Sequence, residues 1–119
     1  ICNSAPSEFL ARLALENRQQ ILERNRRIVL GNLQMLEDFF DAHHDRFHCA
    51  PPQAGPVAFP RLRQGQSAGT LCDELFSKTG VLLLPGQVFG SEYASHFRMG
   101  LGRRDFPEAL ARLDAFLKS

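Results

Sequence analysis

A stretch without proline, from Ser7 to about Asp45, constrains the fold of this 119-residue chain more than any other feature. Its apolar residues recur at the spacing of one helix face, at Phe9, Leu13, Ile21, Leu22, Val29, Leu33, Leu36 and Phe40. Because a helix rises about 1.5 Å per residue, a helix of this span would approach roughly 60 Å, twice the diameter of a small domain. Such a helix cannot pack wholly on the core of its own chain. We therefore treat residues 1–45 as a long connecting helix and residues 46–119 as a separate unit.

Two local signals indicate where this long helix begins and where it is weakest. A serine and a proline precede Glu8, and a hydroxyl group and an acid both favour a helix N-terminus, so we expect the helix to begin by about Ser7. Further along, Gly31 is followed by Asn32, and a glycine in a helix interior costs about 1 kcal/mol relative to alanine. The sequence therefore predicts a kink or break near residues 31–32.

Residues 46–119 carry shorter elements separated by glycine and proline. The pattern predicts short strands over residues 46–50, 57–59, 81–84 and 95–101, and an exposed loop over residues 61–69. The run Val81–Leu84 is wholly apolar, so we expect a buried strand there.

Two further helices are predicted in this second unit. One starts at Ser67 or Thr70 and ends at Gly80, and the other follows Asp105, which has the spacing of a capping box with Glu108. Helices and short strands in this order predict an α+β fold. We expect a two-layer small domain with a short, mostly antiparallel sheet, two packing helices and the long N-terminal helix.

Bulk composition excludes two classes of partner. The 14 Lys and Arg residues balance 13 Asp and Glu residues, so the chain lacks the basic surface that binds nucleic acid or anionic lipid. The longest apolar run, Val81–Leu84, is far shorter than the roughly 20 residues that span a bilayer. We therefore expect no nucleic-acid partner and no membrane partner.

The cysteines and the first residues bear on the origin of the chain. Cys2, Cys49 and Cys72 are odd in number and follow no repeating spacing, which fits neither a disulfide framework nor a zinc ribbon and favours a cytoplasmic location. The chain begins with Ile1 in a polar stretch unlike a signal peptide. We expect the sequence to be a truncated part of a longer protein.

Four side chains near one another in the sequence resemble a metal site at first sight, namely His43, His44, His48 and Cys49. A structural zinc site needs four converging ligands, and histidines at a helix end also suit the helix dipole, so we expect no metal here. Cys72 lies on the apolar side of its predicted helix with no base beside it, and is expected to be a small buried side chain.

Arg98 differs from the other charged residues because it lies in the middle of a predicted strand. Phe97 and Met99 on either side point into the core, so the guanidinium of Arg98 points to the opposite face. There it has the geometry to bind a carboxylate through two parallel hydrogen bonds. An ordinary exposed strand residue is the alternative, and on the pattern alone it is the commoner outcome.

Three segments in register resemble the C-terminal small domain of class I/II aminotransferases, which are pyridoxal 5'-phosphate (PLP) enzymes of fold type I. They are Gly55–Pro60, then Gly80–Gly86 with Phe89–Gly90, then His96–Gly102. The long helix, with its Arg24–Arg27 stretch, is similar to the helix that joins the two domains of that family. The resemblance implies that Arg98 binds the α-carboxylate of an amino-acid or 2-keto-acid substrate.

The resemblance also implies what this chain does not carry. In the family, the lysine that forms the imine with PLP and the cofactor's phosphate site lie in the large domain. Lys78 and Lys118 are the only lysines here, and neither lies in a segment that resembles the lysine motif. We therefore expect no catalytic residue in this fragment, no PLP bound to it and no activity of the fragment alone. The parent enzyme is expected to transfer an amino group between an amino acid and a 2-keto acid in amino-acid metabolism.

Several alternatives stay open. Carbon–sulfur lyases and decarboxylases share the fold, so the parent could catalyse a related PLP-dependent reaction. An aminotransferase-like region of a transcription regulator, or a non-catalytic interaction or oligomerisation module, would also suit a long helix on a compact body. The expected partners are the missing large domain and a second copy of the chain, joined through the apolar stripe Phe9, Leu10, Leu13, Ile21 and Leu22.

Overall fold

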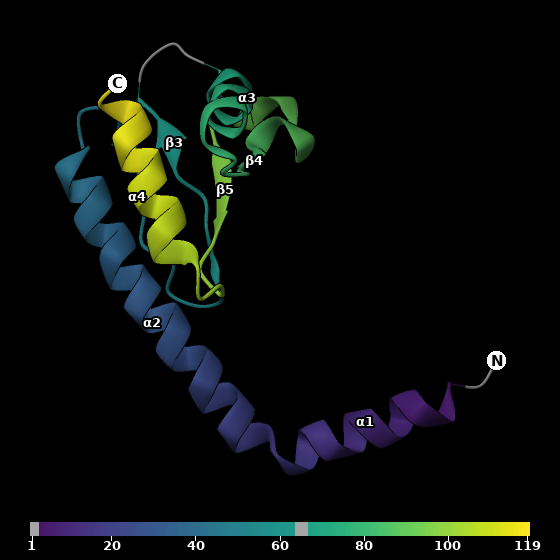
Figure 1. Cartoon of the computed structure of the whole chain (residues 1–119). Coiled ribbons are helices and arrows are strands. Elements are labelled where there is room, and N and C mark those ends of the chain that lie inside the picture. Colours follow the sequence, from purple (N-terminus) through teal and green to yellow (C-terminus); the bar gives the residue numbers. More distant parts are fainter. Residues whose placement is uncertain (1–2, 64–66) are drawn as a thin grey trace.

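The computed structural model describes residues 3–63 and 67–119 (Figure 1). Its helices are α1 (Ala5–Glu16), α2 (Arg18–Ala42), α3 (Ala68–Thr79) and α4 (Phe106–Leu117), with two short 3-10 turns, η1 (Gly86–Val88) and η2 (Ser91–Tyr93). Its strands are β1 (Phe47–His48), β2 (Val57–Ala58), β3 (Arg61–Leu62), β4 (Leu84–Pro85) and β5 (Phe97–Gly100). The predicted α+β class is confirmed.

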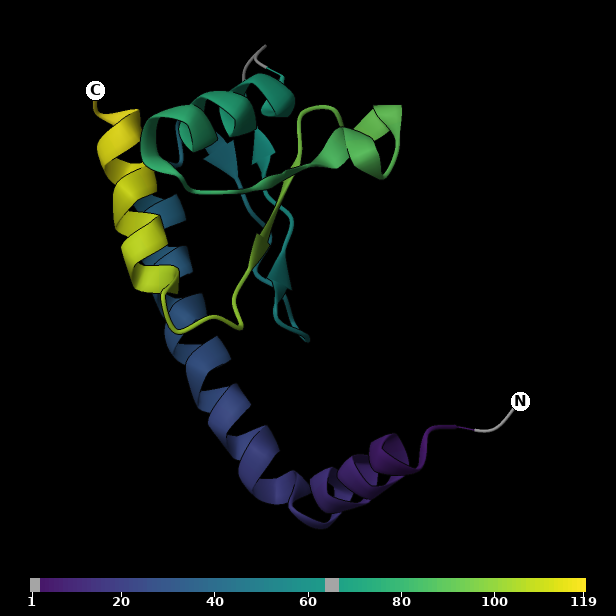
Figure 2. The same cartoon turned by 45° about the vertical axis from the view of Figure 1, so that its right-hand side comes forward.

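The long N-terminal helix is bent at Asn17, where α1 ends and α2 begins (Figures 1 and 2). The side-chain amide of Asn17 donates to the carbonyl of Leu13 at 2.8 Å, so this residue competes for a backbone acceptor of the helix. Of the predicted kink or break near residues 31–32, the break does not occur, because α2 continues through both residues without interruption. Asn32 is buried against the body at that point. The helix begins at Ala5, in agreement with the expected start by about Ser7.

The strands form two small antiparallel sheets. In the first, β5 lies between β2 and β4, with Val57 opposite Gly100 and Leu84 opposite Arg98. In the second, β1 pairs with β3, and an isolated bridge between Arg61 and His96 connects the two sheets. The short, mostly antiparallel sheet is therefore as predicted.

The prediction of a buried strand at residues 81–84 is only half confirmed. Val81 and Leu83 are buried, whereas Leu82 and Leu84 are exposed, and ladder pairing begins only at Leu84. The segment is extended, so its side chains alternate between the core and the opposite face. The expected loop over residues 61–69 lies partly outside the described residues, and Arg61 and Leu62 belong to β3.

One face of the sheets is covered by α3, α4 and the C-terminal part of α2 (Figures 1 and 2). The core between these layers contains the fully buried side chains Leu36, Phe47, Leu75, Phe97, Leu101 and Leu113. Aromatic rings meet edge to face in it, with centroids 5.8 Å apart for Phe47 and Phe97. The other face of the β2–β5–β4 sheet has no α-helix over it in the described part of the chain.

The two later helices begin differently from each other. The hydroxyl of Ser67 accepts the amide of Gly69 at 3.2 Å and starts α3, which ends at Gly80 in the left-handed conformation, as predicted. At α4 the predicted capping box does not form. Asp105 pairs instead with Arg103, and Glu108 pairs with Arg112 one turn along the helix. Each carboxylate is taken by an arginine, so neither caps the backbone.

In the described residues, no helix is both long enough and apolar enough to cross a bilayer.

Candidate carboxylate-binding site

Arg98 lies at the centre of β5 on the face of the sheet that the helices leave uncovered. Burial alternates along this strand, so Phe97 and Met99 are in the core while Arg98 is exposed. Leu84 of β4 is directly opposite Arg98 on one side. On the other side, the ladder of β2 continues towards Phe59, and the amide of Phe97 donates to the carbonyl of Pro60 at 3.0 Å. Continuing the register by one residue places Phe59 beside Arg98.

Several apolar side chains share this uncovered face with Arg98. Val57, Phe59 and Leu84 are each a little more than one-third exposed, and Leu82 is 78% exposed. Within the described part of the chain, the Arg98 side chain makes no hydrogen bond and no ion pair. The electrostatic attraction between a cation with apolar neighbours and an anion becomes stronger when a second surface covers the cation and lowers the local dielectric constant. Arg98 is therefore an exposed guanidinium without a hydrogen-bond or ion-pair partner in the described part of the chain.

An aromatic cluster adjoins Arg98 at the start of β5. The ring of Phe59 stacks on His96 with centroids 5.0 Å apart, and the rings of Phe89 and Tyr93 meet Phe59 edge to face at 5.9 and 5.7 Å. His96 is two residues before Arg98 and so lies on the same face of the strand. Phe59, Phe89 and His96 belong to the three motifs found in the sequence, whereas Tyr93 lies outside them. Their contact was missed because the cluster is assembled from separate segments.

Gly86 makes the close approach of these segments possible. A Cβ atom on Gly86 would lie 2.4 Å from the carbonyl oxygen of Tyr93 and 2.7 Å from that of His96. The amide of Gly86 also donates to the carbonyl of His96 at 2.7 Å. A glycine is therefore required where β4 ends, so that η1 and η2 can pack against the start of β5.

The histidines and cysteines considered as metal ligands do not converge. His43 hydrogen-bonds Asp114 of α4 at 2.7 Å, and His44 hydrogen-bonds the carbonyl of Asp41 at 2.9 Å. No group of three side chains that could hold a metal ion occurs among residues 3–63 and 67–119. Burial raises the pKa of Cys49 to about 11, with a further contribution from Glu37.

Cys72 is buried in α3, as the sequence analysis expected. Burial, assisted by the charge of Asp73, raises the pKa of its thiol to about 11. A thiol with such a pKa is almost entirely protonated at neutral pH, so neither cysteine is an activated nucleophile.

The two lysines lie in the helical layer, away from the face that carries Arg98. The ammonium of Lys78 lies 5.2 Å from the ring centroid of Phe116, and that of Lys118 pairs with Asp114. A PLP cofactor held beside Arg98 would need an amine on the uncovered face of the sheet. The residues of this chain therefore do not fit a complete PLP site.

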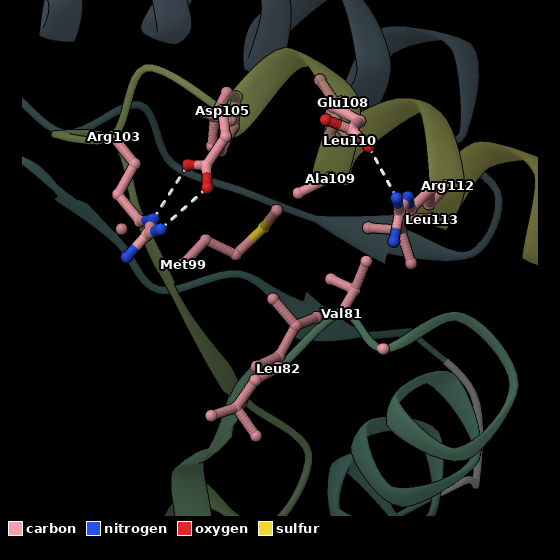
Figure 3. A pocket seen from close by; sticks show the side chains of 14 residues that line it. Val81, Leu82, Met99, Arg103, Asp105, Glu108, Ala109, Leu110, Arg112 and Leu113 are labelled. Atoms are coloured by element: carbon pink, nitrogen blue, oxygen red, sulfur yellow. Dashed lines mark hydrogen bonds and ion pairs between the residues drawn. The ribbon is translucent and has the colours of Figure 1, made fainter.

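A separate cavity lies between residues 80–83, the core side of β5 and the first turns of α4 (Figure 3). Its volume is about 510 Å³, and its floor is apolar, with Met99 and Leu113 among the lining residues. The ion pairs of Arg103 with Asp105 and of Arg112 with Glu108 border it (Figure 3). Arg98 does not line this cavity, so the two features are separate.

Comparison with known proteins supports the aminotransferase fold. No family model matches the chain. A PLP-dependent aminotransferase from Streptococcus suis 89-1591 superposes with a TM-score of 0.86 and 28% identity, over 98% of this chain and 31% of that chain. The PLP-dependent cyclase OrfR superposes equally well, with a TM-score of 0.86 and 26% identity, over 98% of this chain and 32% of that chain.

A curated protein is also similar to this chain in sequence. Capreomycidine synthase from Streptomyces vinaceus is 29% identical over 93 residues, which are 78% of this chain and 23% of that protein. The chain thus spans about a quarter to a third of the length of the proteins it matches. The resemblance to the C-terminal small domain of PLP-dependent aminotransferases is confirmed.

Proposed function

We propose that this chain is the substrate-carboxylate-binding small domain of a PLP-dependent enzyme that acts on amino acids, with transamination as the leading reaction. The observation that carries this proposal is the position of Arg98. Its side chain is exposed at the centre of β5, in an apolar frame, on the face that α3 and α4 leave open. The proposal is further supported by the similarity to PLP-dependent enzymes over nearly the whole chain.

The proposed role of Arg98 is to bind and orient the α-carboxylate. A guanidinium presents two parallel N–H donors to the two oxygens of a carboxylate, and this fork restricts rotation of the bound acid. Since Leu84 lies opposite Arg98 and Phe59 lies beside it, the arginine has an apolar neighbour on each adjacent strand. Orientation of this kind lowers the entropic cost of the later reaction.

The cofactor chemistry belongs to another part of the enzyme in this proposal. PLP supplies an electron sink, which no side chain of this chain replaces. The helical-layer positions of Lys78 and Lys118 leave the uncovered face without an amine. We infer that a large domain covers this face and supplies the cofactor site. The chain itself binds and positions the substrate.

A PLP-dependent cyclisation is the second candidate reaction, because two of the similar proteins are a cyclase and a synthase. Capreomycidine synthase and OrfR match this chain at 29% and 26% identity, close to the 28% of the Streptococcus suis aminotransferase. An arginine that binds the α-carboxylate would serve a PLP-dependent cyclisation as well as a transamination. Release of a 2-keto acid from a panel of amino acids identifies transamination, whereas a cyclic product without keto-acid release identifies the second reaction.

The decisive experiment replaces Arg98 in the intact two-domain enzyme. Loss of a bidentate, charge-assisted pair is expected to cost about 2 to 4 kcal/mol, so Arg98→Ala lowers kcat/KM for amino acids by roughly 30- to 1000-fold. Arg98→Lys is also impaired, because an ammonium group cannot form the two parallel bonds. Cofactor affinity stays unchanged in both variants.

Arg104→Ala is the matched control, since Arg104 is an exposed arginine in the loop that follows β5. This variant is expected to retain the kcat/KM of the wild type. An unaltered kcat/KM for every amino acid in Arg98→Ala would refute the assignment of Arg98. For the chain alone, a PLP absorption band that survives dialysis and disappears in Lys78→Ala would refute the inferred location of the cofactor site.

A further inference from the structure

Asn32 is an unusual residue on the long helix. It is 6% exposed, and it is the one polar or charged side chain that is buried among the described residues. Along α2, every residue before Asn32 is exposed or half-buried. Asn32 is thus the first buried residue where α2 reaches the body of the fold.

The side-chain amide of Asn32 holds the loop that follows β5. Its Nδ2 atom donates to the carbonyl of Leu101 at 2.8 Å and to that of Arg103 at 2.7 Å. The amide of Leu101 in turn donates to the carbonyl of Pro56 at 2.7 Å, just before β2. The end of β5 is therefore tied to the long helix on one side and to its neighbouring strand on the other.

We propose that Asn32 is a positioning residue that sets the place of Arg98 relative to the long helix. This inference rests on the proposed function. Arg98 is only three residues before Leu101 in an extended strand, so the anchored carbonyl lies about 10 Å along the chain from it. A shift of the helix at Asn32 is transmitted through two hydrogen bonds to the strand that carries Arg98.

The direction of hydrogen bonds explains why an asparagine suits this role better than an apolar residue. The other buried residues of α2, among them Leu36 and Phe40, make apolar contacts, which depend little on direction. Two short N–H···O bonds from one amide group specify both distance and angle. In the proposed enzyme, α2 leads towards the large domain. A fixed distance between α2 and Arg98 would hold the substrate carboxylate in register with a cofactor in that domain.

The test uses the intact two-domain enzyme and two small probes, so that an unknown side-chain pocket does not interfere. Propionate carries a carboxylate without an amine, and ethylamine carries an amine without a carboxylate. Asn32→Leu, which keeps the size but removes both donors, is expected to raise the Kd of propionate about tenfold, because a misplacement near 1 Å has effects of this order or larger. The Kd of ethylamine, measured by the same calorimetry, stays unchanged.

Leu36→Ala is the matched control for stability, since Leu36 is buried one turn further along α2 and does not contact the anchored loop through a hydrogen bond. It is expected to lower Tm at least as much as Asn32→Leu without changing the Kd of propionate. Asn32→Ser retains one hydroxyl donor and is expected to give an intermediate Kd. It also serves as the test variant if Asn32→Leu does not fold.

Two outcomes separate the possible failures. If Arg98→Ala raises the Kd of propionate but neither Asn32 variant does, the positioning role is wrong and Asn32 is only structural. If Arg98→Ala itself leaves propionate binding unchanged, the proposed function fails first, and the role of Asn32 fails with it. Hydrogen exchange provides a readout independent of ligands, since loss of the anchor is expected to speed amide exchange over residues 97–104 in Asn32→Leu.

Discussion

The N-terminal arm, residues 3–27, and the body, residues 28–119, use the same helical signal with opposite results. Every residue of the arm is exposed, and Phe9 and Leu10 are each 63% exposed. In the body, Leu36 continues the same apolar stripe of the long helix and is 1% exposed. The periodicity specifies a helix in both regions. Burial follows only where strands and other helices lie within reach of the stripe.

The comparison extends to polar contacts. The arm has local pairs such as Arg12 with Glu16, which is highly exposed and contributes little stability. The body is joined by contacts between distant segments, such as His43 with Asp114 across α2 and α4. Local pairs maintain a helix but do not place it, so the arm depends on a partner surface for its position.

The largest expected effect is self-association of the isolated chain through the arm. Exposed apolar residues from about Ser7 to Leu30 favour pairing with a second copy, so we predict a dimer or higher oligomer at high concentration. Sedimentation equilibrium across a concentration series measures this. Polar substitutions at Leu13 and Ile21 are expected to restore a monomer. A strictly monomeric mass at the highest concentration contradicts the prediction, and a dimer unaffected by the substitutions contradicts the surface.

The second prediction compares phenylalanines in the two regions. Phe97 is fully buried at the centre of the core, so Phe97→Ala is expected to lower the free energy of unfolding by about 3 to 5 kcal/mol. Phe9→Ala in the arm is expected to change it by less than about 0.5 kcal/mol. Urea denaturation followed by circular dichroism measures both. Equal losses in the two variants would show that the arm is packed on a surface in solution.

The third prediction compares two glycines. Gly31 lies inside α2 with nothing within 4 Å of an added Cβ atom, so Gly31→Ala is expected to stabilise the chain by about 1 kcal/mol. Gly80 ends α3 with a φ of +73°, and Gly80→Ala is expected to destabilise it by about 1 to 2 kcal/mol. Thermal denaturation of both variants checks the opposite signs. Destabilisation by Gly31→Ala would mean that the helix bends there in solution.

The smallest expected effect is a dependence of Tm on pH that arises at the contact between α2 and α4. Hydrogen bonds from Lys118 and then His43 lower the pKa of Asp114 below its ordinary value. A carboxyl with a lowered pKa in the folded state contributes stability above the unfolded pKa of about 4, and this contribution is lost as the pH falls through the folded pKa. Tm measured from pH 6 to pH 2 is expected to fall more steeply in the wild type than in Asp114→Asn. Parallel curves would show that the contact adds no stability.

Local chemistry made several elements predictable from the sequence. Ser67 and Gly80 bound α3 as expected, because capping and left-handed termination depend on a few adjacent residues. The alternation around Arg98 also predicted its exposed face, since neighbouring side chains on a strand point to opposite sides. The role of Arg98 in binding a carboxylate stays a prediction.

Other features could not be predicted, because they depend on partners far away in the chain. Asn32 and its glycine neighbour indicated a break, but the Asn32 side chain donates to two carbonyls about 70 residues later, those of Leu101 and Arg103, and α2 continues through it. The bend occurs instead at Asn17, which is exposed. The predicted capping box at Asp105 does not form, because Arg103 pairs with the Asp105 carboxylate.

The sequence by itself determined the helical and extended segments, the α+β class and the side of β5 on which Arg98 lies. Each of these follows from steric and hydrogen-bonding preferences that act over a few residues. Only the tertiary structure decided which half of the long helix is buried and which carbonyls Asn32 binds. It also decided that Phe59, Phe89, Tyr93 and His96 meet beside Arg98. These contacts join residues far apart in the chain, and their free energy is gained only when the segments pack together.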